Sequence, residues 1–378
     1  MEEPVDDLLR SAPLRRKLAR SILKWFAASA RDLPWRRTRD LYCIWISEIM
    51  LQQTQVATVI DYYERFLQVF PNVRSLAEGD ESRVLRLWEG LGYYRRARQL
   101  HAAAKKVVAE HAGQFPRSYE AVRALPGIGR YTAGAILSIG LDQQLPILEA
   151  NTIRVLSRLI ALRDDPRTTP SQAKLWQVAE AILPADRCGA FNQALMELGS
   201  AICTPRQPQC EDCPVALCCA ARAQGLTGQI PLAAKKMQHT DVTETAVVVR
   251  RAARFLVRQC CPGERWAGLW DFPRYASVAA TDPQWLSNSR DHLASWLGVK
   301  IEPISHLATT RHGVTRFRIT LQVLDARYIS GDLPKADSSV RWVTLAELAE
   351  LPLSVTGRKI AGLLGEEKPR RNTVQPTR

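Results

Sequence analysis

Hydrophobic residues recur at helical spacing through the first half of the chain. Leu14, Leu18 and Ile22 place an apolar stripe on a helix expected over residues 13–30. The same period predicts further helices over residues 42–70, 73–77, 82–89, 100–110, 171–182 and 191–201. Strand-like alternation of apolar and polar residues does not occur before residue 240. The chain up to residue 228 is therefore predicted to form an all-helical domain.

After residue 240 the pattern changes to short runs rich in β-branched residues. Strands are predicted over residues 243–250, 253–259, 316–326 and 338–343, and helices over residues 283–296 and 345–350. These elements indicate a smaller α+β domain over residues 242–365, joined through a polar, proline-containing linker at residues 229–241. Residues 366–378 are polar and charged, and we expect them to be disordered.

The charge balance narrows the class of partner. Within 378 residues, 52 Lys and Arg oppose 38 Asp and Glu, so the formal net charge is +14. A surplus of this size favours a polyanion such as nucleic acid, with steeply salt-dependent binding. An anionic membrane is the alternative partner, but no apolar run is long enough to span a bilayer.

The amino terminus and the cysteines indicate the compartment. The opening residues, MEEPVDDLLR, are acidic and lack an apolar core, so they fit neither a secretory signal nor a typical transit peptide. Nine cysteines without such a signal indicate a reducing environment, where clustered cysteines usually bind metal. We expect a monomer in the cytoplasm, associated with DNA.

Four cysteines form a compact cluster with the spacing C-x6-C-x2-C-x5-C: Cys203, Cys210, Cys213 and Cys219. Four thiolates so close in sequence can converge on tetrahedral zinc or on an iron–sulfur cluster. Zinc ribbons usually pair two CxxC units and this segment has one, which favours [4Fe–4S]. The adjacent Cys218 is an alternative ligand, but the spacing favours Cys219. Arg206, within the first loop, is expected to point towards phosphate.

A glycine hairpin, LPGIGR, precedes a helical segment rich in small residues. Gly127 and Gly129 carry no Cβ, so each can take a positive φ and let a partner approach the backbone. The first turn of the following helix would present unpaired N–H groups to an anion such as phosphate. Glu149 follows some twenty residues later. The alternative interpretation is an ordinary helix–turn–helix corner with a surface glutamate.

The helix predicted over residues 42–70 carries a polar strip formed by Glu48, Gln52 and Gln55. The strip is either a solvent face or one wall of a cleft. Glu48 is the only charged residue between Asp40 and Asp61, and its neighbours are apolar. Partial desolvation would raise the pKa of its carboxyl group towards that of a general acid. Residue composition alone leaves both interpretations open.

Taken together, several motifs resemble the MutY-type adenine DNA glycosylases of the helix-hairpin-helix superfamily. The matching stretches, spread over about residues 30–220, are RDLPWR, WISEIMLQQTQV, WEGLGYYRRARQLH, LPGIGRYTAGAI, NTIRVLSR, FNQALMELG and the four-cysteine loop. The resemblance implies a multidomain protein. Its all-α glycosylase domain would contain the hairpin at about residues 121–140 and the iron–sulfur loop at 203–219, and a smaller α+β Nudix-like domain would follow.

The resemblance also implies roles for individual residues around a flipped-out adenine. Glu48 would be the general acid that protonates N7 of the base, which must leave the helix stack before any side chain can reach its glycosidic bond. Glu149, with Asn151 beside it, would stabilise the oxocarbenium-like transition state or act as nucleophile. The base pocket would be completed by Tyr131, Arg31, Trp35 and Leu51.

Contacts to duplex DNA are implied in the same way. Gln53 and Tyr93 would lie where the family wedges the helix open at an 8-oxoguanine opposite the adenine, and Thr54 would be a further DNA-binding residue. The alternative for the segment around Tyr93 is a glycine-capped helix junction with buried tyrosines. The N–H groups around Gly127 and Gly129 would hold phosphate, with an alkali cation as a further expectation. The expected partner is therefore double-stranded DNA that contains an adenine:8-oxoguanine mispair.

The second domain matches the family's Nudix-like lesion-recognition domain through WAGLWDFPR and RHGVTRFRITLQV. Where the family commonly has Phe-Ser-His, this chain has Val314, Thr315 and Arg316. Thr315 keeps a hydroxyl group that can hydrogen-bond an oxidised purine. The REXXEE signature is missing from the sequence, so nucleotide pyrophosphohydrolysis is not expected.

One departure touches the catalytic pair itself. The family has aspartate in a V-D-G-N setting, whereas this chain has Leu148, Glu149, Ala150 and Asn151. Glutamate adds one methylene, and a displacement of roughly 1 Å can cost about 10²-fold in rate. Ala150 cannot take glycine's positive φ cheaply, so we expect a shifted loop and a functional pair with altered geometry.

Three other functions are compatible with the motifs. The first is a mispair-binding protein whose catalysis is attenuated by Glu149 and Ala150. The second is an endonuclease III-like bifunctional glycosylase/lyase, which is disfavoured because Tyr131 stands where that enzyme has its lysine nucleophile, so no Schiff base can form. The third is a basic, cluster-bearing DNA-binding factor without excision activity.

Overall fold

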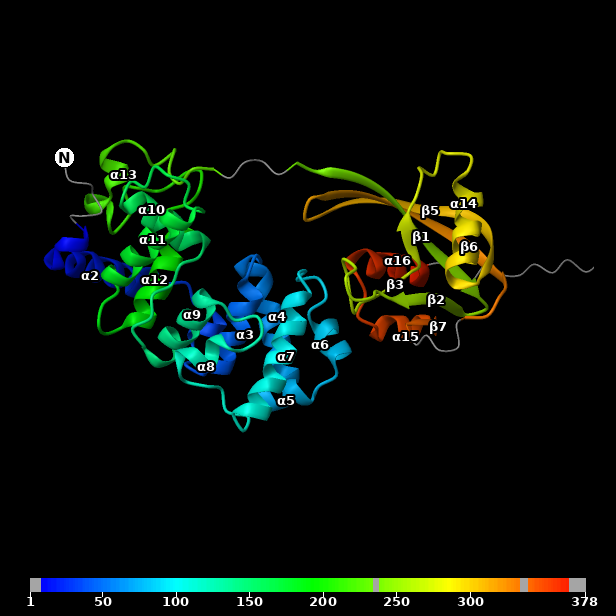
Figure 1. Ribbon diagram of the computed structural model, residues 1–378, viewed down its shortest axis with the longest axis horizontal. Helices are drawn as coiled ribbons and strands as arrows, with labels where there is room; N and C mark the ends of the chain where they lie inside the picture. The colour runs from blue at the N-terminus through cyan, green and yellow to red at the C-terminus, as the bar shows by residue number, and fades with distance from the viewer. Residues whose placement is uncertain (1–7, 234–237, 334–338, 367–378) are drawn as a thin grey trace, which may run out of the picture. The chain divides into compact units, whose positions relative to one another are not determined.

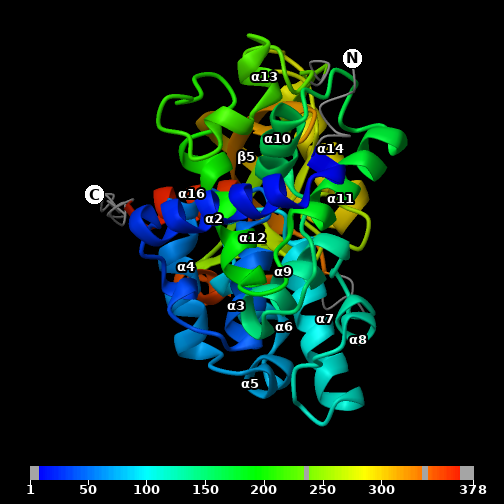
Figure 2. The ribbon, with the colours of Figure 1, turned by 90° about the vertical axis from the view of Figure 1, so that its left-hand side faces the viewer.

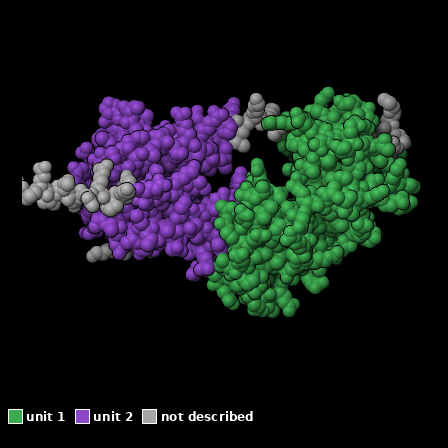
Figure 3. Space-filling view, turned by 180° about the vertical axis from the view of Figure 1, so that it is seen from behind, with its two compact units in different colours: residues 1–79, 95–235 green, residues 80–94, 236–378 purple. Residues whose placement is uncertain are grey.

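The computed structural model describes residues 8–233, 238–333 and 339–366. They form two compact units (Figure 3). One unit comprises residues within 1–79 and 95–235, and the other comprises residues within 80–94 and 236–378. Residues 80–94, which interrupt the first unit in sequence, are thus grouped with the second. The linker predicted at 229–241 overlaps the first strand, which begins at Thr240, and the predicted tail beyond residue 366 lies outside the described residues.

The first unit contains no strand among its described residues, which confirms the prediction of an all-helical domain (Figure 1). Its elements are α2 (Ala12–Ser29), η1 (Pro34–Arg36), α3 (Leu41–Leu51), α4 (Val56–Val69), α5 (Val73–Glu78), α7 (Arg95–Glu110), α8 (Tyr119–Arg123), α9 (Arg130–Leu141), α10 (Ala150–Leu159), α11 (Thr169–Ile182), α12 (Cys188–Ala201), η2 (Ala216–Cys218) and α13 (Ala220–Ala223). Local sequence starts α3, because the carboxylate of Asp40 accepts the N–H groups of Tyr42 at 2.7 Å and Cys43 at 3.2 Å.

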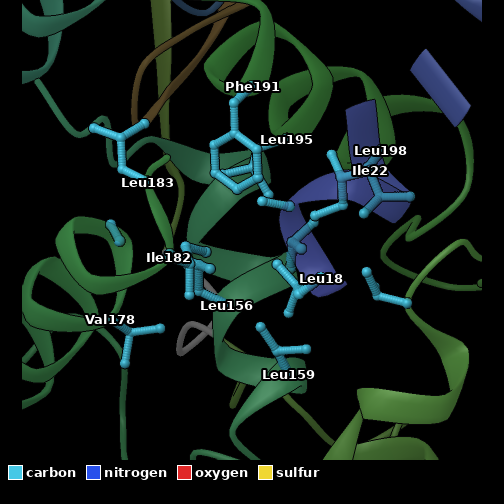
Figure 4. Close-up of a cluster of buried hydrophobic side chains, with 14 of the residues drawn as sticks. Leu18, Ile22, Leu156, Leu159, Val178, Ile182, Leu183, Phe191, Leu195 and Leu198 are labelled. Carbon is cyan, nitrogen blue, oxygen red and sulfur yellow. The ribbon is translucent and has the colours of Figure 1, made fainter. Parts of the chain in front are cut away.

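One hydrophobic core of this unit is built from α2, α10, α11 and α12 (Figure 4). Leu18, Leu156, Ile182 and Phe191 contribute one buried side chain from each of these helices. The helix α2 runs across α12 (Figure 2). A Cβ at Gly199 of α12 would lie 2.6 Å from the Cβ of Asn151, so glycine is needed where α12 passes the start of α10. The packing of these helices therefore fixes the position of the residues that begin α10.

The single helix predicted over residues 42–70 is wrong. α3 ends at Leu51 and α4 begins at Val56, and Gln53 in the turn between them has a left-handed φ of 57°. The cause is the buried Arg96 of α7, whose Nη1 donates to the carbonyl oxygens of Ile49 and Met50 at 2.8 and 2.9 Å and also to that of Gln52. This guanidinium satisfies the carbonyl groups that a continuing helix would use.

The second unit is a mixed sheet with helices on both faces. Its elements are α6 (Glu81–Leu87), β1 (Thr240–Arg251), β2 (Arg254–Gln259), β3 (Trp270–Asp271), β4 (Arg274–Ala276), α14 (Trp285–Leu297), β5 (Lys300–Val314), β6 (Phe317–Ser330), β7 (Val340–Thr344), α15 (Leu345–Glu350) and α16 (Val355–Glu366). The strand order is β3-β2-β1-β6-β5, with β4 paired to β1 and β7 paired to β2. β1 and β6 run parallel, and the other pairs are antiparallel.

Alternation along β1 explains how both faces of the sheet are covered. Ala246 and Val248 pack in one core with residues of α15 and α16, and Val247 and Val249 pack in another with residues of α14 (Figure 1). The predicted α+β class is confirmed. β5 as a whole and α16 were not predicted. β5 is a largely exposed edge strand without a clean apolar alternation, and α16 contains two glycines among its first nine residues.

Candidate active site

A cavity of about 470 Å³ lies in the first unit. Segments far apart in the sequence line it, from η1, α3, α9, α12 and the start of α10. Nine residues predicted for the site are among the lining residues: Arg31, Trp35, Glu48, Leu51, Gln53, Thr54, Tyr131, Glu149 and Asn151. Glu48 and Gln52 of the predicted polar strip therefore belong to a cavity wall, whereas Gln55 is exposed at the start of α4 and does not line the cavity.

Glu48 is 5% exposed on the inner side of α3. The hydroxyl of Tyr131 donates to its Oε2 at 2.7 Å. Burial raises the pKa of Glu48 to about 7; the hydrogen bond from Tyr131 opposes this rise and the charge of Glu149 adds to it. A carboxyl group that exchanges its proton near neutral pH, at the wall of a cavity, is suited to general acid catalysis.

Glu149 caps the N-terminus of α10. Its Oε2 accepts the N–H of Asn151 and its Oε1 accepts the N–H of Thr152, both at 2.8 Å, and the Thr152 hydroxyl accepts the N–H of Glu149 at 2.7 Å. Burial raises the pKa of Glu149, while these backbone N–H groups and Arg154 oppose the rise. The positive end of the α10 dipole favours the ionised carboxylate.

Alanine at position 150 causes no left-handed backbone. Ala150 is the first residue of α10 and is not among the residues with positive φ. The Glu149 side chain folds back onto its own helix, where both carboxylate oxygens accept backbone N–H groups. Asn151 completes this end of the site, since its Nδ2 donates to Oε2 of Glu149 at 3.3 Å and its Oδ1 accepts Nη2 of Arg154 at 2.8 Å.

A buried carboxylate that we did not predict, Glu197 of α12, also lines the cavity. Arg31 contacts it through Nε and Nη2, both at 2.7 Å, and Arg36 contacts it through Nη2 at 2.9 Å. Burial on its own would raise the pKa of Glu197, but the hydrogen bonds from the two guanidinium groups outweigh it and lower the pKa to about 2. Arg31 thus enters the pocket wall as half of an ion pair. The spacing of Gln193, Glu197 and Ser200 on one helical face could have indicated this wall.

Three predicted DNA-contact residues share an unusual backbone conformation. Gln53, Tyr93 and Thr315 have φ values of 57°, 49° and 50°, in the left-handed region that residues other than glycine rarely adopt. Tyr93 is 52% exposed and belongs to the second unit, and Thr315 lies at the tip of the β5–β6 hairpin. Of these three residues, Gln53 lines the cavity, whereas Tyr93 and Thr315 do not. Five other non-glycine residues that the structure describes, Ala161 among them, also have positive φ, so at Gln53 it is the position on the cavity wall that points to a function.

Replacing Gln53 by glycine is expected to raise the free energy of unfolding by up to about 1 kcal/mol, because glycine accepts the left-handed conformation without the steric cost. The same change is expected to slow base excision, since the side chain at the cavity is lost. Chemical denaturation and single-turnover kinetics measure the two effects. Ala161→Gly is the control, because Ala161 has a φ of 51° and does not line the cavity. Equal slowing by both variants would contradict a functional role for Gln53.

The glycine hairpin precedes α9 as expected, but its two glycines differ. Gly127 has a φ of 78°, and a Cβ there would lie 2.9 Å from the Cβ of Gln99. Gly129 is extended, with a φ of −94°, so the positive φ that we allowed for it is not found. As N-cap of α9 it offers no side-chain acceptor to the first N–H groups. The helix start is thus left available to an anion.

The four clustered cysteines face one small cavity in the first unit, whereas Cys218 does not line it. All nine cysteines are free of disulfides. Burial raises the pKa of Cys213 to about 11, and the charges of Cys203, Cys219 and Cys210 add to the rise, so the thiols are close neighbours. Arg158 donates to Sγ of Cys203 at 3.2 Å. Arg206 is exposed in the same loop.

The donor set of this cavity fits a cluster held by thiolates. Within residues 8–233, 238–333 and 339–366, no three His, Cys, Asp or Glu side chains are grouped closely enough to hold a single metal ion. The assignment of a cluster rests instead on the four thiol groups that line one cavity. No helix among the described residues is long and apolar enough to cross a membrane.

The comparisons with known proteins agree with this geometry. Residues 46–181 match the model of the HhH-GPD superfamily base excision DNA repair proteins, and residues 245–362 match the NUDIX domain. Fold and site thus define a helix-hairpin-helix DNA glycosylase joined to a Nudix-like domain. The chain is 33% identical to the adenine DNA glycosylase of Rattus norvegicus, over 92% of this chain and 78% of the relative. It belongs to the adenine DNA glycosylase family.

Two further proteins are similar to this chain. The adenine DNA glycosylase of Buchnera aphidicola subsp. Schizaphis graminum is 38% identical over 71% of this chain and 78% of the relative. The solved structure of a thermostable thymine-DNA glycosylase superposes with a TM-score of 0.51 at 30% identity, covering 56% of this chain and 97% of that chain. Both similarities agree with the assignment of the chain to a DNA glycosylase fold.

Proposed function

We propose that this protein hydrolyses the N-glycosidic bond of adenine mispaired with 8-oxoguanine, or with guanine, after flipping the adenine out of the duplex. The observation that carries the proposal is the meeting of Glu48 and Glu149 in one cavity, with the pKa of Glu48 raised to about 7. Two carboxyl groups in one cavity can divide the roles of general acid and stabilising anion at the same nucleotide.

In the proposed mechanism Glu48 donates its proton to N7 of adenine. The bond between the sugar C1′ and N9 then breaks, and its electron pair leaves with the base. The carboxylate of Glu149, which accepts the N–H groups of Asn151 and Thr152, stabilises the positive charge that develops on the sugar or bonds to it transiently. A water molecule finally adds to C1′ and returns a proton to Glu48, so the products are free adenine and an abasic site.

Tyr131 sets the proton affinity of the acid in this mechanism. Its hydroxyl donates to Oε2 of Glu48 and thereby lowers the pKa of that carboxyl group. In Tyr131→Phe the pKa of Glu48 is expected to rise further, so excision should persist to higher pH than in the wild type. The measurement is the pH at which the single-turnover rate falls to half its maximum. A midpoint that moves to lower pH would contradict this role.

The remaining assignments are part of the same proposal. Domain boundaries of 1–228 and 242–365, a monomeric state and a DNA-associated cytoplasmic location fit the sequence. Gly127 and Gly129 would bind phosphate beside the lesion, with an alkali cation at the hairpin. Thr315 would contact the 8-oxoguanine, although its hydroxyl donates to the carbonyl of Val314 at 2.8 Å and would have to exchange that partner.

We assign a [4Fe–4S] cluster to Cys203, Cys210, Cys213 and Cys219, which would supply a rigid anchor for the loop when bound. The purified protein is expected to contain about four iron atoms per chain together with acid-labile sulfide, and to absorb visible light broadly. Replacing Cys210 by serine should reduce the iron content. Stoichiometric zinc without iron would contradict the assignment.

The function is tested with a panel of duplexes in which adenine stands opposite 8-oxoguanine, guanine or thymine. The proposal expects release of free adenine from the first two and strand cleavage only after alkali treatment. A protein that binds the 8-oxoguanine duplex without releasing adenine would instead be a mispair-binding protein, an outcome that the use of Glu149 as a helix cap makes worth testing. Strand cleavage without alkali would indicate a lyase.

A further inference from the structure

A carboxylate in residues 80–94 is bound by the Nudix-like part of the second unit. Glu89 receives two parallel hydrogen bonds from Arg358 of α16, Nε to Oε1 at 2.7 Å and Nη2 to Oε2 at 2.9 Å. Its Oε2 also accepts the backbone N–H of Leu353 at 3.3 Å. The Glu89 side chain is 9% exposed and that of Arg358 is 28% exposed. A bidentate, largely buried pair of this kind holds its geometry better than a surface ion pair.

Arg358 is itself held firmly. Its Nη1 donates to the carbonyl oxygens of Leu348 and Ala349, both at 3.2 Å, and its Nη2 donates to that of Leu351 at 2.7 Å. These carbonyl groups lie at the end of α15, where a helix has no partners of its own for them. The guanidinium therefore joins α15, α16 and Glu89 in one rigid arrangement.

Glu89 is directly followed by the loop that carries Tyr93. Gly90 and Gly92 have φ values of 101° and 72°, and Tyr93 is itself left-handed. Between them Leu91 is buried, at 6% exposed. Two hydrogen bonds also hold the loop, because Nε1 of Trp88 donates to the carbonyl oxygen of Gly92 at 3.2 Å and the N–H of Gly90 donates to the hydroxyl of Tyr94 at 3.3 Å. With its ends held in this way, the position of Glu89 bears on where the half-exposed Tyr93 ring is presented.

We propose that Arg358 is a positioning residue that couples the Nudix-like domain to the Tyr93 loop, so that recognition of 8-oxoguanine favours opening of the duplex. The inference rests on the proposed function and explains how the enzyme would prefer adenine opposite 8-oxoguanine to adenine opposite guanine. His312 of β5, three residues before Thr315, lies 3.3 Å from Nη2 of Arg274, and Nη1 of Arg274 donates to the hydroxyl of Thr356 at the start of α16 at 2.9 Å. Binding of the oxidised purine at the hairpin would thus stabilise α16, and Arg358 of this helix would pass the effect through Glu89 to the loop. Coupling of this kind accelerates excision opposite 8-oxoguanine and leaves excision opposite guanine unaffected.

The test compares single-turnover excision rates for adenine opposite 8-oxoguanine and opposite guanine in the full-length protein. In Arg358→Gln and in Glu89→Gln the ratio of the two rates is expected to fall about fivefold or more. Both rates come from one preparation, so partial unfolding cannot change their ratio. Because the two residues act as a pair, the double variant is expected to lose no more than either single variant. Arg358→Lys keeps the positive charge but lacks the planar guanidinium group, so its rate ratio should lie between those of the wild type and Arg358→Gln.

The control is Arg327→Gln, which removes an ion pair with Glu302 on the exposed surface of the same domain and should leave the ratio unchanged. An unchanged ratio in both Arg358→Gln and Glu89→Gln would overturn the coupling while the proposed function stands. Additive losses in the double variant would also overturn it. A wild-type protein that shows no preference for the 8-oxoguanine duplex would overturn the proposed function and, with it, the coupling.

Discussion

Replacement of Glu48 by glutamine is expected to reduce adenine excision by about 10³-fold, because the amide keeps the shape of the side chain but cannot donate an acidic proton. Duplex binding should be retained, since the substitution keeps the shape of the side chain and removes no cationic group. The carboxyl group is buried and its pKa is raised to about 7, so the protonated form that the wild type uses is well populated near neutral pH. Single-turnover kinetics and a binding titration measure the two quantities.

The control for this variant is Glu64→Gln, which removes a carboxylate from the exposed side of α4. Glu64→Gln removes a negative charge from the surface, whereas Glu48→Gln removes only the ionised fraction of a group with a pKa of about 7, so the control sets an upper limit on any general electrostatic effect on DNA binding. Rapid excision by Glu48→Gln would show that another group supplies the proton.

Removing the second carboxylate, in Glu149→Ala, is expected to slow excision by about 10²- to 10³-fold, because the charge that stabilises the sugar cation is lost. The same change removes the cap of α10 and is expected to cost about 1 kcal/mol of unfolding free energy. The rate is measured in single-turnover experiments and the stability by chemical denaturation. A normal rate with reduced stability would show that Glu149 is only a helix cap.

Glu149→Asp separates the two roles. Aspartate is a favoured N-cap residue and can accept the N–H groups of Asn151 and Thr152 that now bind Glu149. Because these backbone donors decide where the carboxylate is held, we expect excision within about tenfold of the wild-type rate. A loss as large as that of Glu149→Ala would mean that the longer side chain is required for the geometry of the site.

The catalytic carboxylates could be predicted from sequence for different reasons. Glu48 stands out as a single charge in a long apolar stretch, which is a physical signal of burial. Glu149 was identified through its family motif, and its function as a helix cap could be seen only in the structure. Glu197 was missed, although its motif was recognised, because a glutamate on an amphipathic helix is ordinarily exposed. Only the packing of α12 against the cavity shows that two arginines hold it in the interior.

Most features that could not be predicted from the sequence depend on contacts between side chains far apart in the chain. The end of α3 is set by Arg96, a residue from another helix, so local propensity favoured one continuous helix. Likewise nothing near Glu89 in the sequence points to Arg358. The α+β class and the principal strands were accessible because β-branched runs are a local signal, whereas the edge strand β5 lacks that signal. Local elements could therefore be predicted from the sequence, whereas contacts between residues distant in the chain could not.

The central claim is that a buried, protonated Glu48 starts the reaction, and the pH dependence of the single-turnover rate tests it most directly. With an adenine:8-oxoguanine duplex, the wild-type rate is predicted to fall as the pH rises through about 7, where Glu48 loses its proton. This decline should be absent from the residual activity of Glu48→Gln. A wild-type rate that stays constant through neutral pH, or the same decline in Glu48→Gln, would contradict the account.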